Sequence, residues 1–212
     1  AATTLARAAA ARSIRSAAAS PDRKEGAREL AERLMELDRI QGVFTVAHRA
    51  MADERGKFTE IFRQEWFPQR TWEQVQCNRS ESRRGVLRGL HFHRQQVDYW
   101  QCVDGCIRVG LYDLRPGSST GGAGTILDMD SERPCGIFIP TGVAHGYLAL
   151  TDATIIYVVD RYYDGGNDEF GVAWDDPDIG LAWGVEESEV ILSDRDTANP
   201  SWRDLDDADL PA

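Results

Sequence analysis

The sequence predicts an all-β protein, an antiparallel sandwich or barrel, behind an N-terminal helical extension. Beyond residue 42, short β-rich runs recur about every 8 to 12 residues, separated by turn residues and without alternating helices. Asp104-Gly105 predicts a two-residue hairpin between two of these runs. We therefore expect a helical extension over residues 1–41 and one β domain over residues 42–212.

The extension is predicted to hold a helix that begins after a break at Ser20-Pro21. Serine caps helices and proline suits their first position. The stripe that follows must pack against the β domain or against a second subunit. Its members are apolar and recur at helical spacing: Ala27, Leu30, Ala31, Leu34 and Leu37.

The β domain is predicted from runs rich in β-branched and aromatic residues. These runs are Val43–His48, Lys57–Phe62, Tyr99–Val103, Cys106–Leu114, Gly124–Met129, Gly136–Ile139, Tyr147–Leu150 and Thr154–Val159.

Composition narrows the class of function. The chain has 212 residues, 42% of them hydrophobic, and no apolar run long enough for a membrane-spanning helix, so we expect no membrane association. A net charge of −11 disfavours binding to a nucleic-acid backbone. Four cysteines without paired spacing favour the reducing cytoplasm. The first 19 residues carry arginines and no acid, as organellar transit peptides do, although an Ala-rich helix is the simpler interpretation.

The histidines carry the first chemical signal. His91 and His93 are two residues apart, so on a strand both side chains point to the same face. His145 follows Pro140-Thr-Gly142, while His48 stands alone. A histidine pair facing the interior of a barrel indicates a site.

The segment around this pair resembles a known family. Residues 83–92 read Arg-Arg-Gly-Val-Leu-Arg-Gly-Leu-His-Phe, which resembles the hallmark of the dTDP-4-dehydrorhamnose 3,5-epimerases, cupin-fold enzymes of deoxysugar biosynthesis. The resemblance spans residues 43 to 200 and implies a cupin-type antiparallel β-barrel (jelly roll) and a homodimer. Further matching segments are Asp53–Gly56 with Phe58 and Glu60, Gln76–Asn78, Ile139–Gly146, Ile156-Tyr157, Tyr162-Tyr163, Trp174–Trp183 and Ile191–Asp196.

The resemblance implies that C3 and/or C5 of a dTDP-4-keto-6-deoxy-hexose is epimerised. The protons at both carbons lie next to a ketone, so their removal gives an enolate, and reprotonation from the other face inverts the centre. By resemblance His91 is the base, Asp196 orients it, and Tyr157 is the proton donor across the ring. No cofactor is implied. The residues implied to bind the substrate are Arg55, Phe58, Glu60, Gln76, Asn78, Arg88, His145, Tyr162, Tyr163 and Glu169.

One departure leaves two alternatives open. Where the family has a lysine that stabilises the enolate oxygen, this chain has Asp98, and His93 replaces a glutamine. His91, His93, Asp98 and His145 resemble the metal-binding motif of the wider cupin superfamily and would suit one divalent transition metal. A metal-dependent cupin enzyme, and a cupin that binds a nucleotide sugar without turnover, are therefore the alternatives. The changed lysine also leaves room for a different isomerisation.

Overall fold

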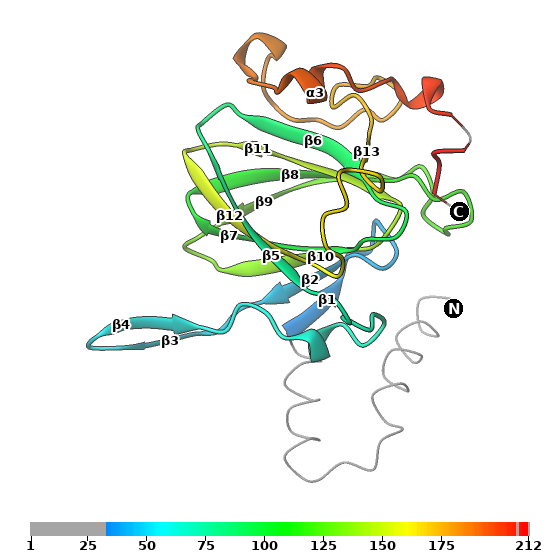
Figure 1. The fold of residues 1–212 in the computed structure, drawn as a ribbon. Helices are drawn as coiled ribbons and strands as arrows, with labels where there is room; N and C mark the ends of the chain where they lie inside the picture. The colour runs from blue at the N-terminus through cyan, green and yellow to red at the C-terminus, as the bar shows by residue number, and fades with distance from the viewer. Residues whose placement is uncertain (1–32, 207, 212) are drawn as a thin grey trace.

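The protein is described by a computed structural model over residues 33–206 and 208–211, and two antiparallel sheets form its body (Figure 1). The six-stranded sheet has the order β1-β2-β10-β7-β12-β5, with strands Leu34–Glu36 (β1), Phe44–Ala47 (β2), Gln76–Ser82 (β5), Asp98–Asp104 (β7), Cys135–Ile139 (β10) and Ala153–Val159 (β12). The five-stranded sheet has the order β13-β6-β11-β8-β9, with strands Leu87–Phe92 (β6), Cys106–Asp113 (β8), Gly124–Asp130 (β9), Val143–Ala149 (β11) and Phe170–Gly171 (β13).

Two smaller features lie outside these sheets. Ala50–Asp53 (β3) and Gly56–Thr59 (β4) pair only with each other, and this hairpin projects away from the body (Figure 1). In the part of the chain that the structure describes, the helical segments are short: the 3₁₀ turns Gln64–Trp66, Glu187–Glu189 and Trp202–Asp204, and one α-helical turn, Asp194–Thr197 (α3). The predicted all-β class is thereby confirmed.

Three apolar clusters hold the layers together. The first lies between the sheets, where residues such as Ile137 of one sheet and Val109 of the other are fully buried. The second joins the outer face of the five-stranded sheet to the C-terminal segment, which contributes Trp174 and Trp183. The third covers the outer face of the six-stranded sheet with aromatic rings around Tyr99. Because the sheets are covered on both faces, most of their strands are apolar on both sides.

The helix expected to run to residue 41 does not extend that far. Leu34–Glu36 form β1, which pairs with β2, and Leu37 bonds through its backbone N–H to the Val43 carbonyl. Pairing with a sheet edge outweighs the helical spacing of Leu34 and Leu37, whose side chains pack against the chain's own clusters. Residues 1–32, with Ser20-Pro21, Ala27, Leu30 and Ala31, lie outside the described residues.

The expected hairpin at Asp104-Gly105 is wrong in its pairing. The turn is present, with Gly105 at φ +76°, where a Cβ would lie 2.2 Å from the Asp152 carbonyl oxygen. However, β7 pairs with β10 and β12, whereas β8 pairs with β11 and β9. The turn therefore carries the chain from one sheet to the other, because each strand finds both of its partners elsewhere in the sequence.

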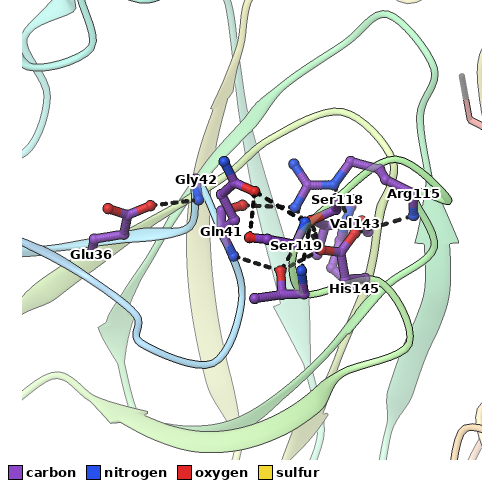
Figure 2. A network of polar contacts seen from close by, with 10 residues as sticks. Glu36, Gln41, Gly42, Arg115, Ser118, Ser119, Val143 and His145 are labelled. Carbon is purple, nitrogen blue, oxygen red and sulfur yellow. Dashed lines mark hydrogen bonds and ion pairs between the residues drawn. The ribbon is translucent and has the colours of Figure 1, made fainter. Parts of the chain in front are cut away.

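A polar network fixes the segment after β1 to the loop after β8 (Figure 2). Asp113 is buried and accepts hydrogen bonds from Arg115, Ser118 and Thr120 at 2.7–2.8 Å. The Arg115 guanidinium also donates to the Gln41 carbonyl at 2.7 Å. Burial opposes ionisation of Asp113, but these donors outweigh it and lower the pKa of its carboxyl. The network thus ties down the end of the barrel next to β11, the strand of His145.

Candidate active site

A cavity of about 490 Å³ opens between the inner faces of the two sheets. His91 on β6 and His145 on β11 reach it from the five-stranded sheet, and Asp98 on β7 and Tyr157 on β12 reach it from the six-stranded sheet. His91 and His93 both line the cavity, as their spacing predicts. The cavity therefore collects the titratable side chains of four strands.

His91 is held by a carboxylate from the far end of the chain. Its Nε2 lies 2.6 Å from Oδ1 of Asp196 in α3. Ser193 caps that turn: its hydroxyl accepts from the Asp196 N–H at 3.1 Å and donates to Asp196 Oδ2 at 2.9 Å. Burial opposes ionisation of Asp196, but the bonds from His91 and Ser193 outweigh it and lower the pKa of the carboxyl. Because the carboxylate accepts the Nε2 proton, the lone pair of a neutral His91 is on Nδ1.

Glu169 stands beside the free nitrogen of His91. Its carboxylate oxygen lies 3.7 Å from His91 Nδ1 and 2.7 Å from the guanidinium of Arg195. Arg195 precedes Asp196 in the same helical turn, so the chain delivers a carboxylate and a cation to His91 together. This arrangement suits a base whose charge changes during a reaction cycle.

A second cluster lies deeper in the cavity, and we name His93, Asp98 and His145 the His–Asp–His cluster. His145 Nε2 and His93 Nε2 lie 2.9 and 3.5 Å from Asp98 Oδ2. Burial favours neutral Asp98, but the two histidines outweigh it and hold the pKa of the carboxyl well below its usual range. Burial likewise disfavours charge on His93, yet Asp98, the Asp168 carbonyl and Glu169 raise its pKa to about 9.

The loop after β6 positions this cluster. The Asp168 carboxylate accepts the backbone N–H groups of Arg94, Gln95 and Gln96, each at 3.0 Å. Gln96 in turn donates from Nε2 to Asp98 Oδ1 at 3.0 Å. Both oxygens of the buried Asp98 carboxylate therefore have a partner: Gln96 contacts Oδ1 and His145 contacts Oδ2.

The structure separates His91 from the other proposed metal ligands. Within the described ranges, the group whose ligand atoms all lie within 4.8 Å of one another contains only His93, Asp98 and His145. His91 is bonded to Asp196 instead. The set of four expected for the metal alternative is therefore wrong in its membership, because a two-residue strand spacing places both histidines at the cavity without making them share a centre.

The expected substrate residues fall into two groups. The Gln76 amide N–H donates to Asn78 Oδ1 at 2.9 Å, and Gln76 Oε1 accepts the Tyr163 N–H at 2.9 Å. Arg55, Phe58 and Glu60 instead lie on or next to the projecting β3–β4 hairpin and do not line this cavity. Those that do line it are Gln76, Asn78, Arg88, His145, Tyr162, Tyr163 and Glu169.

Sequence reasoning missed several lining residues. Tyr147 is two residues beyond His145 on β11, and its hydroxyl bonds Ser82 at 2.9 Å. Trp100 is two residues beyond Asp98 on β7, and its ring meets that of His145 edge-on at 5.0 Å. The same alternation that grouped His91 with His93 would have found both. Gln96 had no such signal, since it lies on a loop.

These features define a class of protein: a double-sheet jelly roll whose central cavity sets a carboxylate-held histidine on one sheet against a tyrosine on the other. These side chains are the ones that an isomerase using acid–base catalysis requires.

Comparison with known proteins specifies the class further. The sequence profile of the dTDP-4-dehydrorhamnose 3,5-epimerases matches residues 38–204. An enzyme of that name from Methanothermobacter thermautotrophicus is 38% identical over 172 residues, covering 78% of this chain and 91% of the relative. The chain therefore belongs to the dTDP-4-dehydrorhamnose 3,5-epimerase family, whose members are nucleotide-sugar isomerases, as the hallmark at residues 83–92 indicates.

Solved structures agree with this assignment. ChmJ from Streptomyces bikiniensis, a 3'-monoepimerase in complex with dTDP-quinovose, superposes with a TM-score of 0.77 at 34% identity, covering 84% of this chain and 93% of that chain. RmlC from Legionella pneumophila, a dTDP-6-deoxy-D-glucose-3,5-epimerase in complex with dTDP-4-keto-L-rhamnose, has a TM-score of 0.77 at 31% identity, covering 84% and 96%. Both solved structures share the fold of this chain, and both are epimerases by name.

Proposed function

We propose that this protein inverts C3, C5 or both of a dTDP-4-keto-6-deoxy-hexose in deoxysugar biosynthesis. The observation that carries the proposal is the His91–Asp196 pair at 2.6 Å, which lines the same cavity as Tyr157, a residue of the opposite sheet. A ring bound between them would present one face to the base and the other to the acid. Relatives solved with dTDP-sugars support this class of substrate.

In this mechanism His91 Nδ1 removes the proton next to the ketone. Asp196 keeps the other nitrogen protonated and stabilises the imidazolium that forms. Tyr157 donates the proton that returns from the opposite face. Burial, followed by the nearby charge of Asp98, raises the pKa of Tyr157 above its ordinary value, so its phenol keeps its proton at neutral pH. These proton transfers draw on the chain's own side chains.

The nucleotide would occupy the outer part of the cavity. Arg88 offers a guanidinium for the diphosphate, and Gln76 and Asn78 offer amides for the base or sugar. Tyr162 and Tyr163 are 59% and 69% exposed at the rim, which suits stacking on the base. Family resemblance supplies these assignments, and their place in the cavity supports them.

Arg55, Phe58 and Glu60 fit the same function only if a second copy of the chain is present. All four residues of β3 are exposed, as are the first three of β4, where Phe58 is 65% exposed. An isolated two-stranded hairpin is only marginally stable in water. We propose a homodimer in which the hairpin of one protomer brings Arg55 and Phe58 to the cavity of its partner.

We also propose that the protein works in the cytoplasm. Cys77, Cys102, Cys106 and Cys135 are all free thiols, as expected in a reducing compartment. Among the residues described, no helix reaches the length and apolar character needed to cross a bilayer.

The deciding experiment is the incorporation of solvent deuterium into dTDP-4-keto-6-deoxyglucose, followed by NMR at C3 and C5. We expect incorporation at one or both carbons, abolished in His91→Asn and in Tyr157→Phe. If the wild-type protein binds the nucleotide sugar and incorporates no deuterium, the protein is a binding module and the proposed reaction is wrong.

A further inference from the structure

The tautomers of the two histidines in the His–Asp–His cluster are set by backbone carbonyl groups. His93 Nδ1 lies 2.6 Å from the Asp168 carbonyl oxygen, and His145 Nδ1 lies 2.8 Å from the Val143 carbonyl oxygen. A carbonyl oxygen only accepts, so both Nδ1 atoms carry hydrogen. If the rings are neutral, both Nε2 atoms present lone pairs toward Asp98.

Three electron-pair donors therefore converge on one buried point. His145 Nε2 is 2.9 Å and His93 Nε2 is 3.5 Å from Asp98 Oδ2. The side chains of His145 and Asp98 are 4% exposed and that of His93 is 11% exposed. The amide nitrogen of Gln96, 3.2 Å from His93 Nε2, can donate a hydrogen bond to that lone pair. A positive charge between the carboxylate and the two imidazole lone pairs, either a proton or a metal ion, would stabilise the buried cluster further.

The surrounding bonds match the pattern around metal-ligating histidines. Such histidines donate their second ring N–H to a carbonyl or carboxylate, which fixes the ring and directs the free nitrogen at the ion. Both histidines of the cluster do so here. Asp98 is oriented as well, because its Oδ1 accepts from Gln96 Nε2 at 3.0 Å and leaves Oδ2 for the centre.

We propose that the His–Asp–His cluster binds one divalent first-row transition-metal ion through His93 Nε2, His145 Nε2 and a carboxylate oxygen of Asp98. Two imidazoles and a carboxylate suit zinc, iron(II), cobalt(II) or manganese(II). When bound, such an ion would supply Lewis acidity toward a carbonyl oxygen. Its relevance to epimerisation rests on the proposed function, whereas binding itself does not.

The proposal leaves His91 free to act as a base. A histidine that ligates a metal through its lone pair cannot also accept a proton there. His91 is bonded to Asp196 and lies outside the cluster, so metal binding and proton abstraction are assigned to different side chains. The positive charge that the family's lysine brings would come in this chain from an ion held by Asp98.

The test is titration of the full-length protein, first stripped of metal with a chelator, with cobalt(II) while its visible absorption is recorded. We expect one equivalent per chain, competed by zinc, and a loss of affinity of at least about a hundredfold in His93→Gln and in His145→Gln. His91→Asn is the matched control and should retain both stoichiometry and affinity. Circular dichroism and thermal unfolding establish that each variant is folded.

Three outcomes would overturn the inference: no cobalt band in the wild type, equal affinity in folded His93→Gln, or an equal loss in His91→Asn. In the first case protons, rather than a metal, neutralise the cluster. Deuterium incorporation is measured on the same preparations and separates the two proposals. Incorporation without cobalt binding overturns the metal site alone, whereas cobalt binding without incorporation overturns the proposed reaction alone.

Discussion

Asp196 shows how a single carboxylate connects local structure to chemistry. It belongs to the first turn of a four-residue helix, accepts a bond from its serine cap, and reaches a histidine 105 residues earlier in the chain. The cap residue Ser193 and the carboxylate that contacts His91, the proposed base, thus lie in one turn, so replacing either disturbs the same imidazole to a different degree.

We predict that Asp196→Asn lowers the rate of deuterium incorporation by about 1,000-fold or more, with little change in KM, because the amide no longer stabilises the imidazolium. Asp194→Asn, the same change on the same helical turn, is the control: Asp194 is exposed and should be replaceable at nearly full rate. Similar rates for the two variants would contradict the role given to Asp196.

His48 predicts a dependence of stability on pH that is independent of the active site. Burial, with a contribution from Arg33, lowers its pKa to about 4 in the folded protein, against 6.5 for the free side chain. The unfolded chain therefore takes up a proton at higher pH than the folded chain. The stability that neutral His48 contributes is complete above pH 6.5 and is lost as the pH falls toward about 4.

The measurement is urea unfolding of the wild type and His48→Gln, near neutral pH and at about pH 4. The variant should lose less free energy of unfolding on acidification, since an amide does not titrate. Glutamine still offers a carbonyl oxygen to Tyr99, whose hydroxyl is 2.6 Å from His48 Nε2. If acidification lowers the free energy of unfolding equally in both proteins, His48 does not titrate in this range.

At the scale of elements, strand β10 contains Gly136 at a position where the Tyr99 side chain leaves no room for a Cβ. A Cβ on Gly136 would lie 1.9 Å from the Tyr99 hydroxyl oxygen and 2.2 Å from the ring carbon that bears it. Tyr99 is fully buried among the aromatic rings outside the six-stranded sheet, so it has little room to shift. The glycine makes room for the tyrosine of the neighbouring strand.

Gly136→Ala is therefore predicted to lower the free energy of unfolding by roughly 1–3 kcal/mol, as overpacking of a core does. Gly117→Ala is the matched control, because nothing lies within 4 Å of a Cβ there. Chemical denaturation of both variants tests the prediction, and a Gly136 variant as stable as the control would show that the aromatic cluster adapts.

The elements differ in how far their sequences predict them. The strands around 99–103, 106–114, 124–129, 136–139 and 154–159 were predictable because their β-branched and aromatic residues suit buried sheets. Strand β5 was not, since Gln76, Asn78 and Ser80 line the cavity and its sequence is polar. Only pairing with β12 makes it a strand.

The site shows the same limit. A spacing of two residues predicts that His91 and His93 share a face, and the structure agrees. No local pattern relates His91 to Asp196 or Asp98 to His145, since these contacts join different strands and loops. Family resemblance supplied the first pair, and resemblance to the cupin metal-binding motif supplied the cluster around Asp98 with His91 as a fourth member. Only the folded chain shows that His91 lies outside that cluster.

For the whole molecule, the projecting hairpin predicts that two chains complete each other's sites. Arg55→Ala and Tyr157→Phe should each be nearly inactive alone. When the two variants are unfolded together and refolded, activity should return in mixed dimers, because one cavity is intact and receives an intact hairpin from its partner. Light scattering should give the mass of a dimer.

The control mixes His91→Asn with Tyr157→Phe, both of which damage the cavity. That mixture should regain no activity, because each chain then has a damaged cavity of its own and an intact hairpin from its partner cannot repair it. Recovery in the control, or none in the first mixture, would mean that Arg55 serves its own chain or none.

The base and the acid of the proposed reaction stand on opposite sheets, so no strand fixes their separation. The apolar cluster between the sheets fixes it instead, and Tyr147 and Trp100 belong to that cluster and to the cavity wall. The distance between the two sheets thus affects the rate of the proposed proton transfers. Side chains that never meet a sugar, such as Ile137 and Val109, act as spacers that set how far a proton must travel.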